Sequence, residues 1–222
     1  MNQFNTLGLK AVIFDMDGLL FESEALYIKG WVAIGPTLGL PITEDAARAT
    51  IAVAGKDMEA IFQAHYGPAF TLETAIPPLR QWLTDHITEY GLIIRPGARE
   101  LLELLHTKGI PFAIGTSNTK DAADSFLEVT GLTEYFPHIV AGDMVDHIKP
   151  APDIFLKAAA ELGFRPEECL VLEDSPIGIK AAHTAGCLPV MVPNLIEPTA
   201  EALSLAWRVF SCLNEVSEAL FS

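Results

Sequence analysis

Short apolar runs that end in polar residues recur along the chain, separated by stretches with helical periodicity. The first run, Ala11–Phe14, has the length and character of a buried parallel strand. Further strands are predicted at Pro111–Gly115, His138–Ala141, Cys169–Leu172, Pro189–Val192 and Trp207–Phe210. Helices are predicted at 96–106, 119–129, 152–162 and 176–185, and a final helix runs to about Leu220. This alternation predicts an α/β fold, in which helices cover both faces of a parallel sheet.

Residues 21–93 follow a different pattern, without a convincing strand. Helical periodicity runs through Glu24–Ile34, Asp57–Tyr66 and Leu72–Tyr90, and glycine or proline interrupts it between these segments. We therefore expect a small all-helical domain over residues 21–93. It would be inserted after the first strand of a core that is formed by residues 1–20 and 94–222.

Composition narrows the class of protein. The chain is 50% hydrophobic and 19% charged, so a folded core is expected rather than disorder. Its formal net charge of -15 disfavours nucleic acid and anionic membranes as partners. The three cysteines show no CxxC spacing, which argues against a zinc site or a disulfide framework. With no signal-peptide pattern and no membrane-length apolar run, we expect a cytoplasmic location.

Acidic residues follow two of the predicted strands. Asp15 and Asp17 come directly after the first strand, and Glu173 and Asp174 follow Leu172. In an open parallel sheet, ligands bind at the carboxyl ends of the strands. Two close carboxylates repel each other, and Mg²⁺ relieves that repulsion. Solvated acids in a turn, or acids near a helix N-terminus, would give the same local pattern.

Two further polar segments suit a phosphate group. Thr116-Ser117-Asn118 lies between a predicted strand and a helix, where hydroxyl, amide and backbone N–H groups form a phosphate cradle. The same residue types are also common helix caps. Lys149, in a proline-rich loop, could neutralise a phosphoryl group or could be a solvated loop residue.

Taken together and in order, these motifs resemble the haloacid dehalogenase superfamily, in its subgroup with a helical cap. The resemblance covers Ala11 to about Asn194 and is most specific at 13–20, 149–155 and 172–182. It implies a Rossmann-like core, a mobile cap, and a Mg²⁺-dependent phosphatase. Such an enzyme hydrolyses a small phosphorylated metabolite through an aspartyl-phosphate intermediate.

The resemblance also implies catalytic roles at matching positions. Asp15 is expected to be the nucleophile, and Asp17 the general acid/base. Thr116 is expected to hold phosphoryl oxygens, and Lys149 to bridge the nucleophile and the phosphoryl group. The expected metal ligands are Asp15, Asp17 through its backbone carbonyl, Glu173 and Asp174.

Phosphate and substrate contacts complete the expected site. The resemblance implies that the Ser117 N–H and the Asn118 side chain help to bind the phosphoryl group. In the cap, the turn Ala54-Gly55-Lys56-Asp57 is expected to begin a helix, and Lys56 is a candidate contact to the leaving group. That lysine could equally be a solvated residue of the first helical turn.

Alternative activities share these motifs. A β-phosphoglucomutase-like isomerase is the main one, although Tyr27 stands where that branch usually has histidine. A dehalogenase is disfavoured because Asp17 is present, and a non-catalytic binding module because Asp15, Asp17 and Lys149 are all retained. Parts of the chain also resemble sugar-phosphate and pseudouridine-5′-phosphatase-like enzymes. The expected substrate is thus a sugar phosphate or a nucleotide-like monoester, and the expected state a monomer.

Overall fold

The computed structural model describes residues 3–53 and 55–221 of the chain. The chain forms two compact units. The first, the sheet unit, comprises Met1–Glu22 and Ile93–Ser222; the second, the helical unit, comprises Ser23–Leu92. None of the described helices is both long and apolar enough to cross a membrane.

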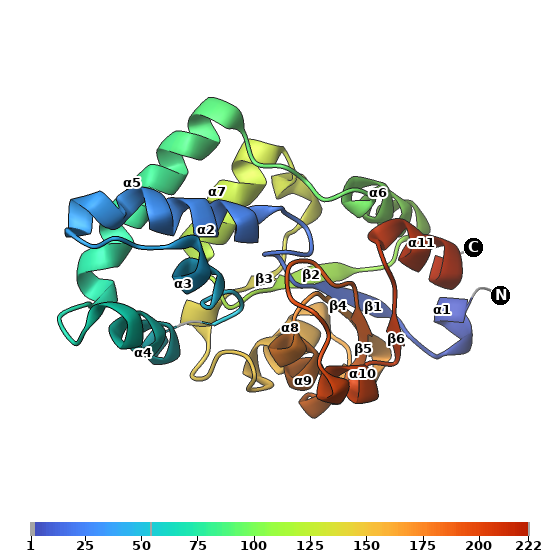
Figure 1. The fold of residues 1–222 in the computed structure, drawn as a ribbon. Helices are drawn as coiled ribbons and strands as arrows, with labels where there is room; N and C mark the ends of the chain where they lie inside the picture. The colour runs from blue at the N-terminus through green and yellow to red at the C-terminus, as the bar shows by residue number, and fades with distance from the viewer. Residues whose placement is uncertain (1–2, 54, 222) are drawn as a thin grey trace. The chain divides into compact units, whose positions relative to one another are not determined.

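A six-stranded parallel sheet forms the centre of the sheet unit (Figure 1). Its strands, in sheet order, are β3 (Ile139–Val140), β2 (Phe112–Gly115), β1 (Ala11–Phe14), β4 (Cys169–Glu173), β5 (Leu188–Met191) and β6 (Arg208–Val209). All neighbouring pairs are parallel. Every residue of β1 and β4 is buried, as expected for apolar strands that are covered on both faces. The predicted α/β fold is confirmed.

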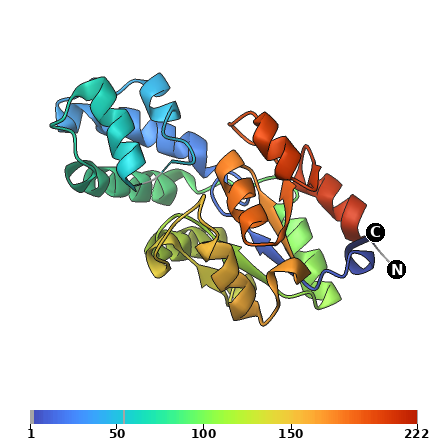
Figure 2. The same ribbon diagram turned by 90° about the horizontal axis from the view of Figure 1, so that it is seen from below.

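Helices pack on both faces of this sheet (Figures 1 and 2). On one face, Ile13 and Val171 pack with Phe155 and Ala181 in a single hydrophobic cluster. Those last two residues belong to α8 (Asp153–Leu162) and α9 (Pro176–Thr184). On the other face, α6 (Ala98–Lys108) packs against α11 (Leu213–Phe221). The remaining helices of the sheet unit are α1 (Gln3–Thr6), α7 (Lys120–Thr130), η2 (Thr133–Tyr135), η3 (Gly142–Met144), η4 (Pro166–Glu168) and α10 (Ala200–Leu205).

Helices α1 and α11 pack against each other in this unit (Figure 1). Phe4 of α1 lies 4.9 Å, between ring centroids, from Phe221 of α11. The sequence pattern did not predict α1 or α10. Each has six residues or fewer, which is too short for a helical period to repeat, so tertiary packing must stabilise it.

The described part of the helical unit contains no strand. Its helices are α2 (Ser23–Ile34), η1 (Gly35–Leu38), α3 (Glu44–Arg48), α4 (Gly55–Tyr66) and α5 (Leu72–Tyr90). An aromatic cluster holds it together: the Phe62 ring lies 4.6 Å from Trp31 and 4.7 Å from Phe70, between centroids. Of the predicted turn at 54–57, Ala54 lies outside the described residues.

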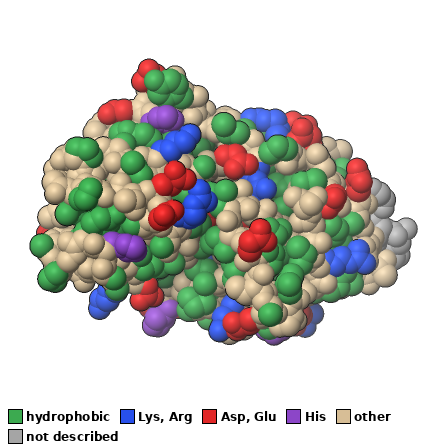
Figure 3. Space-filling model, viewed as in Figure 1, with side chains coloured by type: hydrophobic (Ala, Val, Ile, Leu, Met, Phe, Trp, Pro, Cys, Tyr) green, Lys and Arg blue, Asp and Glu red, His purple; other side chains and the backbone are tan. Residues whose placement is uncertain are grey.

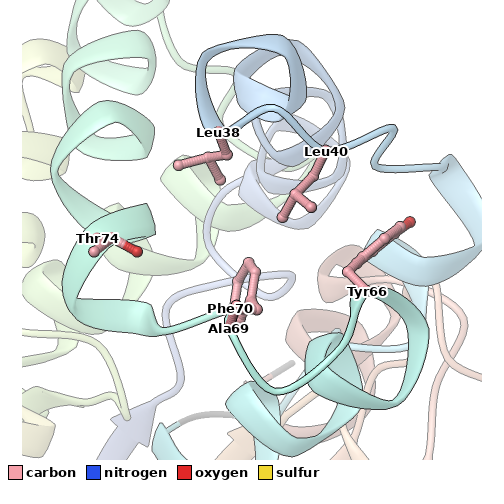
Figure 4. Close-up of a pocket in the computed structure, with 6 residues that line it drawn as sticks. All are labelled: Leu38, Leu40, Tyr66, Ala69, Phe70 and Thr74. Carbon is pink, nitrogen blue, oxygen red and sulfur yellow. The ribbon is translucent and has the colours of Figure 1, made fainter.

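A small pocket of about 120 Å³ opens within the helical unit (Figure 4). Its lining consists of Leu38, Leu40, Tyr66, Ala69, Phe70 and Thr74. The Tyr66 hydroxyl oxygen accepts a hydrogen bond from the backbone N–H of Thr43 at 2.9 Å. None of the predicted site residues lines this pocket. On the face shown in Figure 3, lysine and arginine side chains lie singly or beside acidic ones.

Candidate active site

The carboxyl ends of the central strands bring the predicted residues together. Phe14 of β1 pairs with Leu172 of β4, so Asp15 and Glu173 follow at the same edge of the sheet. The Asp15 backbone N–H donates to the Leu172 carbonyl at 2.9 Å. Strand β2 lies on the other side of β1 and ends just before Thr116, which is buried. One sheet edge therefore carries residues that are far apart in sequence, as open parallel sheets require.

Lys149 lies at the centre of the site. Its Nζ donates to Asp15 Oδ1 at 2.5 Å and to Glu173 Oε1 at 2.7 Å. The lysine side chain is only 3% exposed, and its Nζ lies 4.7 Å from the centroid of the Phe155 ring. The next peptide bond, to Pro150, is cis. Lys149 is thus a buried cation that bridges two carboxylates, and it is not a solvated loop residue.

The far side of Glu173 is held by the start of α9. Its Oε2 accepts from the Ser175 backbone N–H at 2.8 Å and from the Ser175 hydroxyl at 2.9 Å. Ser175 also caps the helix, because its Oγ accepts from the Gly178 N–H at 3.1 Å. Both oxygens of Glu173 therefore have partners, and the helix N-terminus fixes the carboxylate that in turn holds Lys149.

Burial and charge shift the pKa values of the central pair. Burial raises the pKa of Asp15 from 3.8 to about 8, with Lys149 opposing it and Glu173 acting in the same direction. Burial would lower the pKa of Lys149, but Asp15 and Glu173 outweigh it and raise that pKa above its ordinary value. The lysine is therefore held charged. Any further cation beside these carboxylates would favour ionised Asp15, the form in which this side chain could act as the predicted nucleophile.

Three buried carboxylates could hold a metal ion. Asp15, Glu173 and Asp174 each offer an oxygen, and these oxygens lie within 4.8 Å of one another. All three residues are at most 6% exposed. Three carboxylates at such short range repel one another, so the donor set suits a hard divalent cation that prefers oxygen ligands. The Asp17 carboxylate does not belong to this group, and the sequence prediction assigns only its backbone carbonyl to the metal.

Asp17 projects from a tight turn after β1. Gly18, the next residue, has a φ of 79°, a conformation that glycine adopts without strain. Asp17 Oδ2 accepts from the Asn118 side-chain amide at 3.2 Å. Asn118 in turn donates its backbone N–H to Thr116 Oγ1 at 3.0 Å. The predicted phosphate-binding segment and the predicted acid/base are thus in direct contact.

Ser117 carries a polar atom with an unusual environment. Within the described residues, its buried Oγ has no hydrogen-bond partner. A buried hydroxyl without a partner is costly, so such groups commonly bind a ligand or water. Ser117 could therefore offer two donors to a phosphate group: this hydroxyl, and the backbone N–H that the family resemblance implies.

Lys56 is the one predicted site residue that belongs to the helical unit. It is exposed and lies in the first turn of α4. Its contact with a leaving group stays a prediction.

Sequence reasoning assigned no role to Ser175 or Gly178, although both lie in the specific stretch 172–182. A serine immediately before a predicted helix, as at Ser175, is a recognisable N-cap signal. The packing role of Gly178 leaves no such local signal. A Cβ at Gly178 would overlap the carboxyl group of Glu173, so only glycine lets that carboxylate lie against the helix.

Replacing Gly178 with alanine is expected to lower kcat by about 10²-fold, because Glu173 must move and Lys149 then loses its position. Overpacking should also lower the free energy of unfolding by about 1–3 kcal/mol. Steady-state kinetics and urea unfolding measure the two effects. In the double variant with Glu173→Ala the overlap is gone, so its stability loss should be smaller than the sum of the two single losses. Additive losses would contradict the proposed overlap.

The chain is similar in sequence to known proteins. Residues 9–186 match the sequence profile of a family described as haloacid dehalogenase-like hydrolases. A phosphorylated carbohydrates phosphatase of Thermotoga maritima is 34% identical over 178 residues, covering 80% of this chain and 82% of that protein. A fructose-1-phosphate phosphatase of Escherichia coli is 33% identical over 182 residues, covering 79% and 92%.

A solved structure shows the same likeness over more of the chain. The crystal structure of CbbY from Rhodobacter sphaeroides, in complex with phosphate, has a TM-score of 0.82 and 25% sequence identity. The match covers 94% of this chain and 96% of that one.

Proposed function

The chain belongs to the haloacid dehalogenase-like hydrolases, and we propose that it is a phosphatase that acts on a small phosphorylated metabolite through an aspartyl-phosphate. The observation that carries the proposal is the buried Lys149, which bridges Asp15 and Glu173 at the edge of the sheet. A buried charge network of this kind is costly to a fold, and such networks cluster at functional sites. The unpartnered Ser117 hydroxyl supports an oxyanion as the ligand.

In the first half of the reaction, an Asp15 oxygen attacks phosphorus and forms an acyl phosphate as the bond to the leaving oxygen breaks. Asp17 donates a proton to that oxygen, so an alcohol departs. In the second half, Asp17 accepts a proton from water, which attacks the same phosphorus. The bond between Asp15 and phosphorus breaks, and inorganic phosphate leaves.

Charge neutralisation and alignment carry most of the catalysis of phosphoryl transfer. Lys149 would hold phosphoryl oxygens beside Asp15, and Thr116 and Ser117 would donate to the others. Asn118 would orient the Asp17 carboxyl through the amide contact described above.

The metal expected here is Mg²⁺. Asp15, Glu173 and Asp174 would hold it, together with the Asp17 carbonyl, because the cluster offers hard oxygen ligands at short range. When bound, Mg²⁺ would supply positive charge against the phosphoryl oxygens and the carboxylates.

The proposed substrate class is a phosphorylated sugar or a nucleotide-like monoester. The names of two relatives support it, since both describe phosphatases of phosphorylated carbohydrates. A panel of sugar phosphates and nucleotides, read by release of inorganic phosphate in the presence of Mg²⁺, tests the proposal. Conversion of a sugar phosphate into an isomer without phosphate release would instead indicate a mutase. No turnover of any monoester would contradict both activities.

Lys56 is expected to contribute to selectivity. Replacing it with alanine should raise KM or lower kcat/KM for the preferred substrate, with little effect on a generic aryl phosphate. Only the preferred substrate has a leaving group with polar atoms to which Lys56 can bind. Lys29→Ala, also at an exposed helical position of the same unit, serves as the matched control. Equal losses on both substrates, or none on either, would show that Lys56 does not recognise the leaving group.

A further inference from the structure

Arg95 joins separate segments of the sheet unit through one largely buried side chain, which is 12% exposed. Its guanidinium donates to the carbonyl oxygen of Gly18 and, at 3.4 Å, to that of Pro193. Its Nε lies 3.4 Å from Glu22 Oε1. Its backbone N–H donates to the Leu20 carbonyl at 2.9 Å. A planar fork with several donors can make these contacts at once, which a lysine cannot.

The Gly18 contact acts on the turn that presents Asp17. Gly18 directly follows Asp17, and its N–H donates to the Phe21 carbonyl at 3.0 Å, which closes the turn. Fixing the carbonyl of Gly18 therefore restricts the backbone from which the Asp17 side chain projects. No other role is assigned to this arginine by the proposed reaction.

The same side chain braces the two connections of the sheet unit to the inserted residues. The Glu22 N–H donates to the Ile93 carbonyl at 2.9 Å, and Phe21 forms an antiparallel bridge with Ile94. Glu22 and Ile93 are the boundary residues of the sheet unit. Arg95 lies on the connection that leads out of the inserted residues. From there its side chain contacts the turn after Asp17 and, at Glu22, the connection that leads into the inserted residues.

We propose that Arg95 is a positioning residue for Asp17. By holding the Gly18 carbonyl and pairing with Glu22, it keeps the Asp17 carboxyl aligned with the oxygen of the leaving group. The inference rests on the proposed phosphatase function, and in it Arg95 does not touch the substrate.

Leaving-group dependence separates this role from a merely structural one. The value of kcat/KM reports the steps up to release of the alcohol, in which Asp17 donates its proton. An alkyl phosphate needs that proton, whereas 2,4-dinitrophenolate is a stable anion that departs without it. A displaced Asp17 should therefore slow the alkyl substrate selectively, while general damage to the fold should slow both.

The experiment compares fructose 1-phosphate, or the best alkyl phosphate of the panel, with 2,4-dinitrophenyl phosphate. For Arg95→Ala and Arg95→Lys we expect kcat/KM to fall about 10- to 100-fold on the alkyl substrate, which is a part of the full contribution of general-acid catalysis. On the aryl substrate we expect kcat/KM to fall less than about threefold. Asp17→Asn calibrates the pattern and should show a larger difference in the same direction. Glu22→Gln should show a smaller one.

Arg99→Ala is the matched control. Arg99 is also partly buried, and it donates to a backbone carbonyl, that of Thr130, at 3.0 Å. It should change thermal stability without changing the ratio of the two kcat/KM values. Equal losses on both substrates in the Arg95 variants, or a selective loss in Arg99→Ala, would overturn the inference. A parent protein that hydrolyses neither substrate would instead overturn the proposed function itself.

Discussion

Replacing Asp15 with asparagine is expected to abolish turnover while the fold is kept. The amide is nearly isosteric with the carboxyl group, but it cannot attack phosphorus, and the loss of a nucleophile removes the whole covalent route. Phosphate release on the best substrate measures the effect.

The stability of Asp15→Asn should not fall at pH 7. Burial raises the pKa of Asp15 to about 8, so the unfolded chain releases this proton more readily than the folded one. Above the ordinary aspartate pKa this group therefore lowers the free energy of unfolding as pH rises, a cost that asparagine lacks.

The site of covalent chemistry can be checked directly. Beryllium fluoride or aluminium fluoride should form an adduct on Asp15, beside Lys149, and should form none on Asp15→Asn. Asp124→Asn is a surface control, since Asp124 is exposed and paired with Lys120. An adduct on any other carboxylate, or full turnover by Asp15→Asn, would refute the assignment of the nucleophile.

Removal of divalent metal is the second change with a large expected effect. Exhaustive chelation should abolish turnover and Mg²⁺ should restore it, because three buried carboxylates offer oxygen ligands within reach of a single ion. Excess Ca²⁺ should inhibit, since a larger and more loosely coordinated ion disturbs in-line geometry. Phosphate release during titration with each ion measures both effects.

Thermal unfolding gives an independent readout of metal binding. Mg²⁺ at about 100 times its dissociation constant should add about 2.7 kcal/mol to the free energy of unfolding. Asp174→Asn should weaken this stabilisation, and the surface variant Asp124→Asn should not. Full activity after chelation would contradict a metal at the three-carboxylate cluster. So would a melting temperature of the parent protein that does not change when Mg²⁺ is added.

The arrangement of elements could be predicted largely from local sequence. Ala11–Phe14 is a strand over the predicted residues, and Asp15 follows it. The other predicted strands and the long helices agree with the structure to within one or two residues. The short helix α3 in the helical unit, Glu44–Arg48, was missed, because five residues leave too little periodicity to detect.

The sequence by itself determined the strands, the helices, and the polar residues that end the strands, because apolar runs, periodicity and breakers act over a few neighbouring positions. Only the tertiary structure decided which of those residues meet. Lys149 and Asp15 are 134 positions apart, Asn118 and Asp17 are 101 apart, and Arg95 and Gly18 are 77 apart. The strand order places β1 between β2 and β4, so the residues that follow these strands lie close together. The Glu173 carboxylate fits against the start of α9 because residue 178 is glycine. No local pattern encodes such partners, because they depend on how distant segments pack.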